Sequence, residues 1–169
     1  VIPNVDAAGN AWFVKNIKLV NGPAEEFKAL ATFNPKDTVI IQNQLATGVV
    51  QPQWDSSATI QMTRFDNDTI EYTTQATSPQ FAVFSEIYYA DGWNAYLDGV
   101  KTPYYKVNYL LRGMNVPAGN HKIVFIFEPQ SYKTGNNVSF IASILIIVIF
   151  IGGLAMAWIK RKKGPDKLT

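Results

Sequence analysis

FAVFSEIYY, residues 81–89, is the stretch of sequence that decides the fold. Its side chains alternate between two faces, one with Phe81, Val83, Ile87 and Tyr89 and the other with Ala82, Phe84, Glu86 and Tyr88. A period of two in a run rich in aromatic and β-branched residues is typical of a β-strand. We therefore expect 81–89 to be the longest strand of a mainly β domain.

Shorter segments of the same character lie on both sides of this strand. Residues 11–20 and 38–42 read as single strands, and three pairs read as hairpins: 59–65 with 69–76, 93–97 with 100–108, and 112–116 with 121–128. Turn residues such as Asp98-Gly99 separate the members of each pair. This spacing predicts an antiparallel β-sandwich, jelly-roll-like in layout.

One short helix is predicted between the strands 11–20 and 38–42, at Ala24–Phe33. Pro23 suits the first helical turn, and Glu25 and Glu26 suit the positive end of the helix dipole. The apolar face of this helix would hold Phe27, Leu30 and Ala31.

Residues 138–159 form a different kind of segment, because they are apolar and carry no charge. As a helix they would span about 33 Å, enough for the hydrocarbon core of a bilayer. Trp158 suits the membrane interface, and the basic run 160–163 follows directly. The positive-inside rule then predicts three parts: an extracytoplasmic domain at 1–137, ending in a link at 129–137, a transmembrane helix at 138–159 and a basic cytoplasmic tail at 160–169.

This orientation carries a further expectation. A domain at 1–137 needs an upstream signal to cross the membrane, and the chain shows no signal-peptide pattern. We therefore expect the chain to be the C-terminal piece of a longer protein, with earlier transmembrane helices as its partners.

Composition excludes several classes of function. The formal net charge is +2, but five of the fifteen basic residues follow the apolar segment, so the rest of the chain is slightly acidic and nucleic acid is not an expected partner. Without cysteine, and with His121 as the only histidine, the chain suggests no metal site, no cofactor and no Ser-His-Asp triad.

Two features of the sequence remain as candidates for a catalytic or binding role. Glu86 lies within the strand among aromatic residues: facing inward it would have a raised pKa and could act as a general acid, but it could equally pair with Arg112 or face solvent. The second feature is an aromatic cluster, which either packs within the sheets or forms a platform for sugar rings: Tyr88, Tyr89, Trp93, Tyr96, Tyr104, Tyr105 and Tyr109.

Three sequence blocks carry a family resemblance: SEIYYADGWNAYLDG (85–99), YKVNYLLRG (105–113) and VPAGNHKI (116–123). They closely resemble the C-terminal region of the YfhO family of bacterial membrane proteins, although Ala90-Asp91 stands where the family pattern often has proline. The resemblance implies a multi-span protein of the bacterial inner membrane, similar to GT-C glycosyltransferases that use lipid-linked sugars and act on cell-envelope polymers. Such enzymes carry their catalytic carboxylate in an early loop, so no carboxylate of this chain inherits a catalytic role.

Within the resembling region we single out Glu86, Trp93, Asn108 and Arg112. They could form a structural latch, with Arg112 paired to Glu86 or Asp98. Alternatively they could converge on one face that meets a glycan, a lipid-linked sugar or the membrane-embedded part of the protein. A purely structural or protein-interaction module is the competing interpretation. A stand-alone hydrolase is disfavoured, because no nucleophile–base or paired-acid arrangement is evident.

Overall fold

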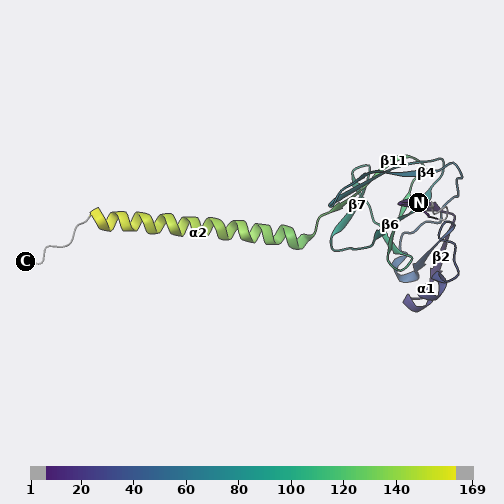
Figure 1. Cartoon of the computed structure of the whole chain (residues 1–169), viewed down its shortest axis with the longest axis horizontal. Coiled ribbons are helices and arrows are strands. Elements are labelled where there is room, and N and C mark those ends of the chain that lie inside the picture. Colours follow the sequence, from purple (N-terminus) through teal and green to yellow (C-terminus); the bar gives the residue numbers. More distant parts are fainter. Residues whose placement is uncertain (1–6, 163–169) are drawn as a thin grey trace, which may run out of the picture. The chain divides into compact units, whose positions relative to one another are not determined.

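The computed structural model describes residues 7–162 (Figure 1). This range holds the helices α1 (Pro23–Leu30) and α2 (Gln130–Lys162), and a 3-10 helix, η1 (Asn43–Leu45). The strands are β1 (Ala11–Val14), β2 (Asn16–Val20), β3 (Thr38–Gln42), β4 (Thr59–Phe65), β5 (Thr69–Ala76), β6 (Gln80–Ile87), β7 (Trp93–Leu97), β8 (Val100–Lys101), β9 (Tyr105–Val107), β10 (Leu111–Val116) and β11 (Gly119–Phe127). The chain divides between Glu128 and Pro129 into a β unit, which holds the strands, and a helical unit, which holds α2.

Two antiparallel sheets form the body of the β unit. The four-stranded sheet has the order β1-β6-β10-β9, and the five-stranded sheet has the order β4-β5-β11-β7-β8. Buried side chains from both sheets form one core, among them Tyr72, Phe84, Met114 and Phe125. The predicted antiparallel fold, with one long apolar C-terminal helix, is confirmed.

Strand β6 lies at the centre of the layers, and its first five residues, 80–84, are buried on both faces. Ala82 and Phe84 face the five-stranded sheet, whereas Phe81 and Val83 contact a third layer. That layer is a parallel pair, β2 with β3, and α1 covers its other face through Ala29. Figure 1 shows β6 between β4 and β11 on one side and β2 and α1 on the other. Because both faces are covered at these residues, the alternation of side chains along β6 does not separate a buried face from an exposed one.

The predicted single strand at 11–20 is wrong, because the chain changes sheets within it. Lys15 and Asn16 both donate their backbone N–H groups to the carbonyl of Asp37, at 2.8 and 3.0 Å. These bonds separate β1, which pairs with β6, from β2, which pairs with β3. One apolar segment therefore contributes to two layers.

Of the three predicted hairpins, one is confirmed and two differ from the prediction. Strands β4 and β5 pair as expected. In the second, β7 pairs with the short β8, and the chain then crosses to the other sheet as β9. In the third, β10 and β11 belong to different sheets, and the turn at 117–118 carries the chain between layers. Turn residues predict where the chain bends, but not which layer it enters next.

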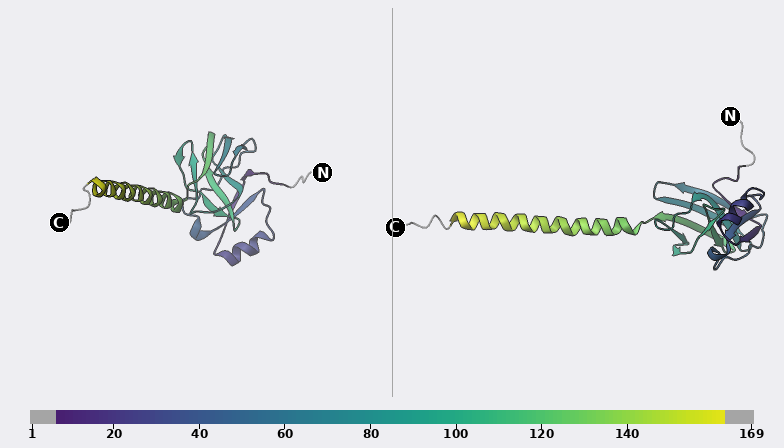
Figure 2. Two further views of the ribbon diagram at one scale, coloured as in Figure 1. Left: turned by 60° about the vertical axis from the view of Figure 1, so that its left-hand side comes forward. Right: turned by 90° about the horizontal axis from the view of Figure 1, so that it is seen from below.

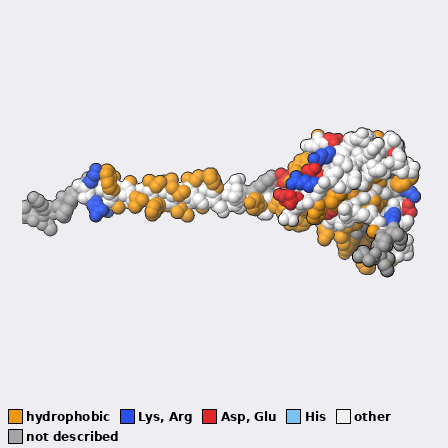
Figure 3. Space-filling model, turned by 45° about the horizontal axis from the view of Figure 1, so that its top comes forward, with side chains coloured by type: hydrophobic (Ala, Val, Ile, Leu, Met, Phe, Trp, Pro, Cys, Tyr) orange, Lys and Arg blue, Asp and Glu red, His pale blue; other side chains and the backbone are white. Residues whose placement is uncertain are grey.

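The helical unit is longer than predicted. Helix α2 begins at Gln130, so the segment 129–137, expected as a short link, is largely helical. A candidate membrane span covers Thr134–Lys162 and includes the predicted segment 138–159. Its last turn is basic. Figure 2 shows α2 as one continuous helix, and Figure 3 shows apolar side chains along most of it. Residues 163–169 of the predicted tail lie outside the described residues.

Candidate functional site

A hollow of about 580 Å³ opens where several strands of the β unit begin or end. Strands β4 and β6 end beside it, and β5, β7 and β10 begin there. Its wall combines apolar and aromatic side chains with acids, an amide and a buried arginine: Phe65, Asp66, Asn67, Ile70, Ser85, Glu86, Ile87, Tyr89, Trp93 and Arg112. Three of the four residues singled out in the sequence therefore lie together.

Arg112 lies beneath the hollow, with only 2% of its surface exposed. Its Nε donates a hydrogen bond to the carbonyl of Ile87 at 3.0 Å. The guanidinium carbon lies 4.5 Å from the ring centroid of Trp93 and 5.0 Å from that of Phe125. Among the described residues, one guanidinium nitrogen, Nη1, has no hydrogen-bond partner. Ring faces thus supply much of the stabilisation that water would otherwise give this cation.

Burial also perturbs the ionisation of groups around Arg112. It lowers the pKa of the guanidinium from its ordinary value, although nearby Tyr104, Glu86 and Tyr72 act in the opposite direction. Arginine stays charged even so, because its ordinary pKa is so high. Burial likewise raises the pKa of Tyr104 to about 12, so its hydroxyl remains a neutral donor. That hydroxyl donates to the carbonyl of Trp93 at 3.0 Å and supports the first residue of β7.

Glu86 is half-buried, and a tyrosine of the core forms a hydrogen bond with its carboxylate. The hydroxyl of Tyr72, which is fully buried, donates to Glu86 Oε2 at 2.9 Å. Burial, followed by the Glu86 carboxylate, raises the pKa of Tyr72 well above its usual range. Tyr72 therefore stays a donor, and Glu86 is positioned as a hydrogen-bond acceptor at the wall of the hollow.

Trp93 is partly exposed and borders two hollows. It lines the one above Arg112 and a second of about 400 Å³ beside Pro103 and Tyr104. The indole packs against Phe127, with ring centroids 5.3 Å apart. An aromatic ring with an accessible edge or face beside a carboxylate offers apolar contact and a hydrogen-bond acceptor in one place.

Asn108 does not join the other three residues. It is 7% exposed, and its Oδ1 accepts a hydrogen bond from the N–H of Ile40 at 2.8 Å. The N–H of Asn108 in turn donates to the carbonyl of Ile40 at 2.9 Å. These bonds tie the segment between β9 and β10 to β3, so the convergence suggested by the sequence is limited to Glu86, Trp93 and Arg112.

The suggested pairing of Arg112 with Asp98 is wrong. Asp98 lies in the β7–β8 turn, where Oδ2 contacts His121 Nδ1 at 2.6 Å and Oδ1 accepts the N–H of Lys122 at 2.8 Å. The Asp98-Gly99 turn is thus anchored to β11. Its carboxylate belongs to a second surface.

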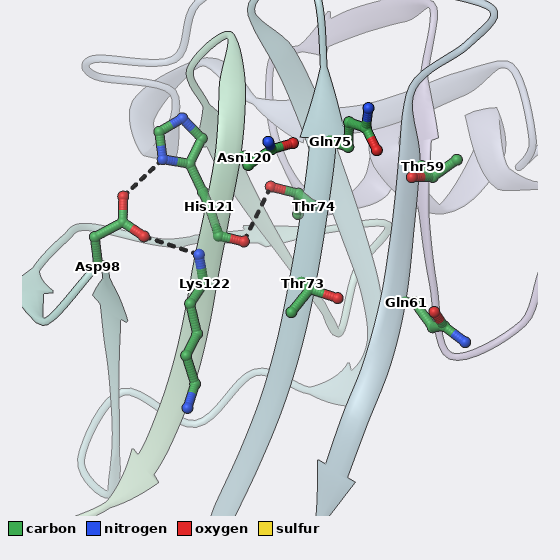
Figure 4. A pocket seen from close by; sticks show the side chains of 9 residues that line it. All are labelled: Thr59, Gln61, Thr73, Thr74, Gln75, Asp98, Asn120, His121 and Lys122. Atoms are coloured by element: carbon green, nitrogen blue, oxygen red, sulfur yellow. Dashed lines mark hydrogen bonds and ion pairs between the residues drawn. The ribbon is translucent and has the colours of Figure 1, made fainter.

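That second surface is a polar hollow of about 720 Å³ across three neighbouring strands (Figure 4). Cross-strand register aligns hydroxyl and amide side chains in rows, because Thr59 and Asn120 both pair with Gln75, and Gln61 pairs with Thr73. The His121–Asp98 pair lies at one side of it (Figure 4). Sequence reasoning did not single out this surface, although Thr59 and Gln61 alternate with Ile60 and Met62 in the printed sequence.

The His121–Asp98 pair predicts a pH dependence. Its hydrogen bond to Asp98 raises the pKa of His121, and bonds from Lys122 and then His121 lower that of Asp98. The histidine contribution to stability is therefore complete below about pH 6.5 and is lost as pH rises through the raised folded pKa. The aspartate contribution is present above about pH 4 and is lost on further acidification.

We therefore expect the free energy of unfolding to fall between about pH 5.5 and about pH 9 by less than about 1 kcal/mol, because the pair is partly exposed. Denaturant unfolding at the two pH values measures this. His121→Gln and Asp98→Asn should both flatten the difference, since Asn still accepts the N–H of Lys122 and tolerates the positive φ of residue 98. A pH dependence unchanged in both variants would contradict the assignment, because His121 is the only histidine in the chain.

A comparison with models of protein families places residues 43–139 in the family described as "Bacterial membrane protein YfhO". The chain belongs to the YfhO family. The match covers more than half of the chain and contains the hollow above Arg112. The membrane character of the YfhO family agrees with the candidate span in α2. No curated protein and no solved structure matches the chain.

Two residues of this YfhO site are visible only in the structure. Tyr72 and Phe125 contact Glu86 and Arg112, but in the sequence they look like any other alternating apolar or aromatic residue. Tyr104, which supports Trp93, belongs to the aromatic cluster already singled out in the sequence. Within residues 7–162 no group of three or more His, Cys, Asp or Glu side chains is arranged to hold a metal ion.

Proposed function

We propose that the β unit is a glycan-binding module of a YfhO-family membrane protein, and that the hollow above Arg112 is its binding site. By its family resemblance, the whole protein would be a glycosyltransferase that uses lipid-linked sugars and modifies cell-envelope polymers. The β unit would bind or support the acceptor and would not perform the transfer. Upstream helices of the same protein would supply the catalytic region.

One observation carries this proposal: the combination of rings and hydrogen-bonding groups around a single hollow. Trp93 and Tyr89 offer apolar ring surface, which suits the C–H face of a sugar. Glu86, held by Tyr72, offers an acceptor for sugar hydroxyls, and Asn67 and Ser85 add further polar groups. Sites for small polar ligands combine largely apolar walls with a few fixed polar groups in this way.

The orientation in the membrane is part of the proposal. Lys160, Arg161 and Lys162 form the last turn of α2, and no comparable basic cluster precedes the span. The positive-inside rule supports a cytoplasmic C-terminus and an extracytoplasmic β unit in the inner membrane.

A purely structural role is the second candidate, and the burial of Arg112 favours it. A guanidinium enclosed by Trp93, Phe125 and the carbonyl of Ile87 joins the two sheets, which a latch requires. In this alternative the same residues stabilise the β unit, and the hollow has no ligand.

Replacing Trp93 with alanine separates the two candidates. If the hollow binds glycan, Trp93→Ala in the membrane-reconstituted chain should weaken binding to envelope oligosaccharides by about tenfold or more, as measured by calorimetry, because a central aromatic contact is lost. Trp54→Ala is the matched control, since Trp54 is also exposed but lies over Lys15, away from the hollow. Equal affinity in wild type and both variants, or no binding by the wild type, would favour the structural role.

A further inference from the structure

An exposed apolar patch lies between α1 and the segment that joins β9 to β10. It consists of Phe27, Tyr109 and Leu110, which are 67%, 40% and 45% exposed. The rings of Phe27 and Tyr109 contact each other edge to face, with centroids 6.2 Å apart. We call this group the Tyr109 patch. Figure 3 shows apolar side chains gathered along one flank of the β unit.

The backbone at Tyr109 is strained. Asn108 and Tyr109 have φ angles of 47° and 71°, in the left-handed region that bulky residues avoid. For a bulky residue such as Tyr109 this conformation is unfavourable, and it persists only when its surroundings hold it. Here Glu26 accepts a hydrogen bond from the N–H of Tyr109 at 2.7 Å. The backbone N–H and carbonyl of Ile40 both form hydrogen bonds with Asn108. The β unit therefore keeps an unfavourable backbone conformation at Tyr109 while the ring of that residue is exposed.

One basic side chain contacts the patch, and a second is next to it in the sequence. Lys106 Nζ lies 5.2 Å from the ring centroid of Tyr109, and Lys28 follows Phe27 on α1. The acid next to Phe27, Glu26, is buried and already bound, and Glu25 accepts the N–H of Asn21. Aromatic and aliphatic groups bordered by lysine match the apolar boundary and anionic headgroups of a lipid surface.

Within the β unit, Leu110 is linked through Tyr88 and Tyr89 to the end of β11. The carbonyl of Leu110 accepts the N–H of Tyr88 at 2.7 Å, and the next residue, Tyr89, lies beside Gly92 together with Phe127. Three residues after Phe127, helix α2 begins at Gln130. The eight residues from there to Val138 rise by about 12 Å along the helix axis.

We propose that the Tyr109 patch is a contact surface for anionic lipid headgroups of the membrane that α2 enters. Phe27, Tyr109 and Leu110 enter the interfacial layer, while Lys28 and Lys106 meet the phosphates. This contact is independent of glycan binding, because it uses none of the residues that line the hollow.

Single-cysteine spin labelling of the full chain tests the proposal, since the chain has no cysteine of its own. Leu110→Cys and Phe27→Cys place labels in the patch. Val100→Cys is the matched control, because Val100 is 68% exposed in the β7–β8 hairpin, at the other end of β7 from Trp93. The proteins are reconstituted at low density in vesicles of phosphatidylcholine with phosphatidylglycerol, and electron paramagnetic resonance compares label collisions with oxygen and with a water-soluble nickel complex.

The ratio of collisions with oxygen to collisions with nickel should be several-fold higher at positions 110 and 27 than at position 100. The ratio at positions 110 and 27 should fall when phosphatidylglycerol is omitted, and also when Lys28 and Lys106 are both changed to glutamate. Ratios at 110 and 27 equal to that at 100 would overturn the proposal. So would nickel protection that depends on protein density instead of lipid charge, because that would identify a second copy of the chain as the occupant.

Discussion

Arg112→Ala should lower the free energy of unfolding of the β unit by about 3 kcal/mol. The change removes a hydrogen bond to the carbonyl of Ile87 and two ring contacts, and leaves a cavity between the sheets. Relief of the desolvation of the cation offsets part of this loss, because burial disfavours the charged form. Denaturant unfolding of the membrane-reconstituted chain, followed by near-ultraviolet circular dichroism, measures the difference.

Arg64→Ala is the matched control. Arg64 also contacts acids, Asp66 at 3.1 Å and Glu71 at 3.9 Å, but its side chain is half exposed. Its loss should cost less than about 1 kcal/mol. If the two alanine variants unfold alike, Arg112 is not a latch between the sheets.

Arg112→Met separates packing from charge. Methionine fills much of the space without a buried charge, and such replacements of buried ions are often close to neutral for stability. A Met variant as stable as the wild type would show that the guanidinium is not needed for the fold. If that variant also lost glycan affinity, the charge would have a part in binding.

Local patterns in the sequence predicted local structure well. The β4–β5 hairpin follows from two alternating segments around Asp66-Asn67-Asp68, and α2 follows from length and hydropathy alone. The assignment of strands to layers could not be obtained this way. For example, Gly113 lies so close to β6 that an added Cβ would be 2.6 Å from the Phe81 ring, a constraint that only the packed layers reveal.

The candidate site shows the same limit. The family pattern points to Glu86, Trp93 and Arg112. These residues are close enough in the sequence to suggest that they also lie close together in space. Tyr72 and Phe125 come from strands of the other sheet, so no local pattern links them to Arg112. The helix face was also mispredicted, since Phe27 is exposed and Glu26 is buried in α1.

Glu26→Gln should lower the free energy of unfolding by about 2–3 kcal/mol, although it changes one atom. Glu26 is 1% exposed, and both of its partners are donors: the N–H of Tyr109 and Nε2 of Gln42, each at 2.7 Å. A glutamine oxygen can replace one of these acceptors, and its amide group would then face the other donor. Turning the Gln42 amide over would break the bond that its oxygen accepts from Gln44 at 3.0 Å. The buried donor left without an acceptor accounts for the loss.

Glu25→Gln is the matched control on the same helix. Glu25 is exposed and accepts one bond, from the N–H of Asn21 at 2.8 Å, which a glutamine oxygen can also accept. We expect this variant to lose less than about 1 kcal/mol. Unfolding of the two variants under one set of conditions compares a buried and an exposed carboxylate that are adjacent in sequence.

A double-mutant cycle with Tyr109→Gly tests what Glu26 holds in place. Glycine adopts a positive φ without strain, so the conformation at residue 109 no longer depends on the bond to Glu26. The cost of Glu26→Gln should therefore be smaller in the Tyr109→Gly background, with an interaction energy of about 1 kcal/mol. Strictly additive losses would show that Glu26 stabilises α1 through Gln42 alone, and that the strained Tyr109 is held by Asn108 and Ile40 instead.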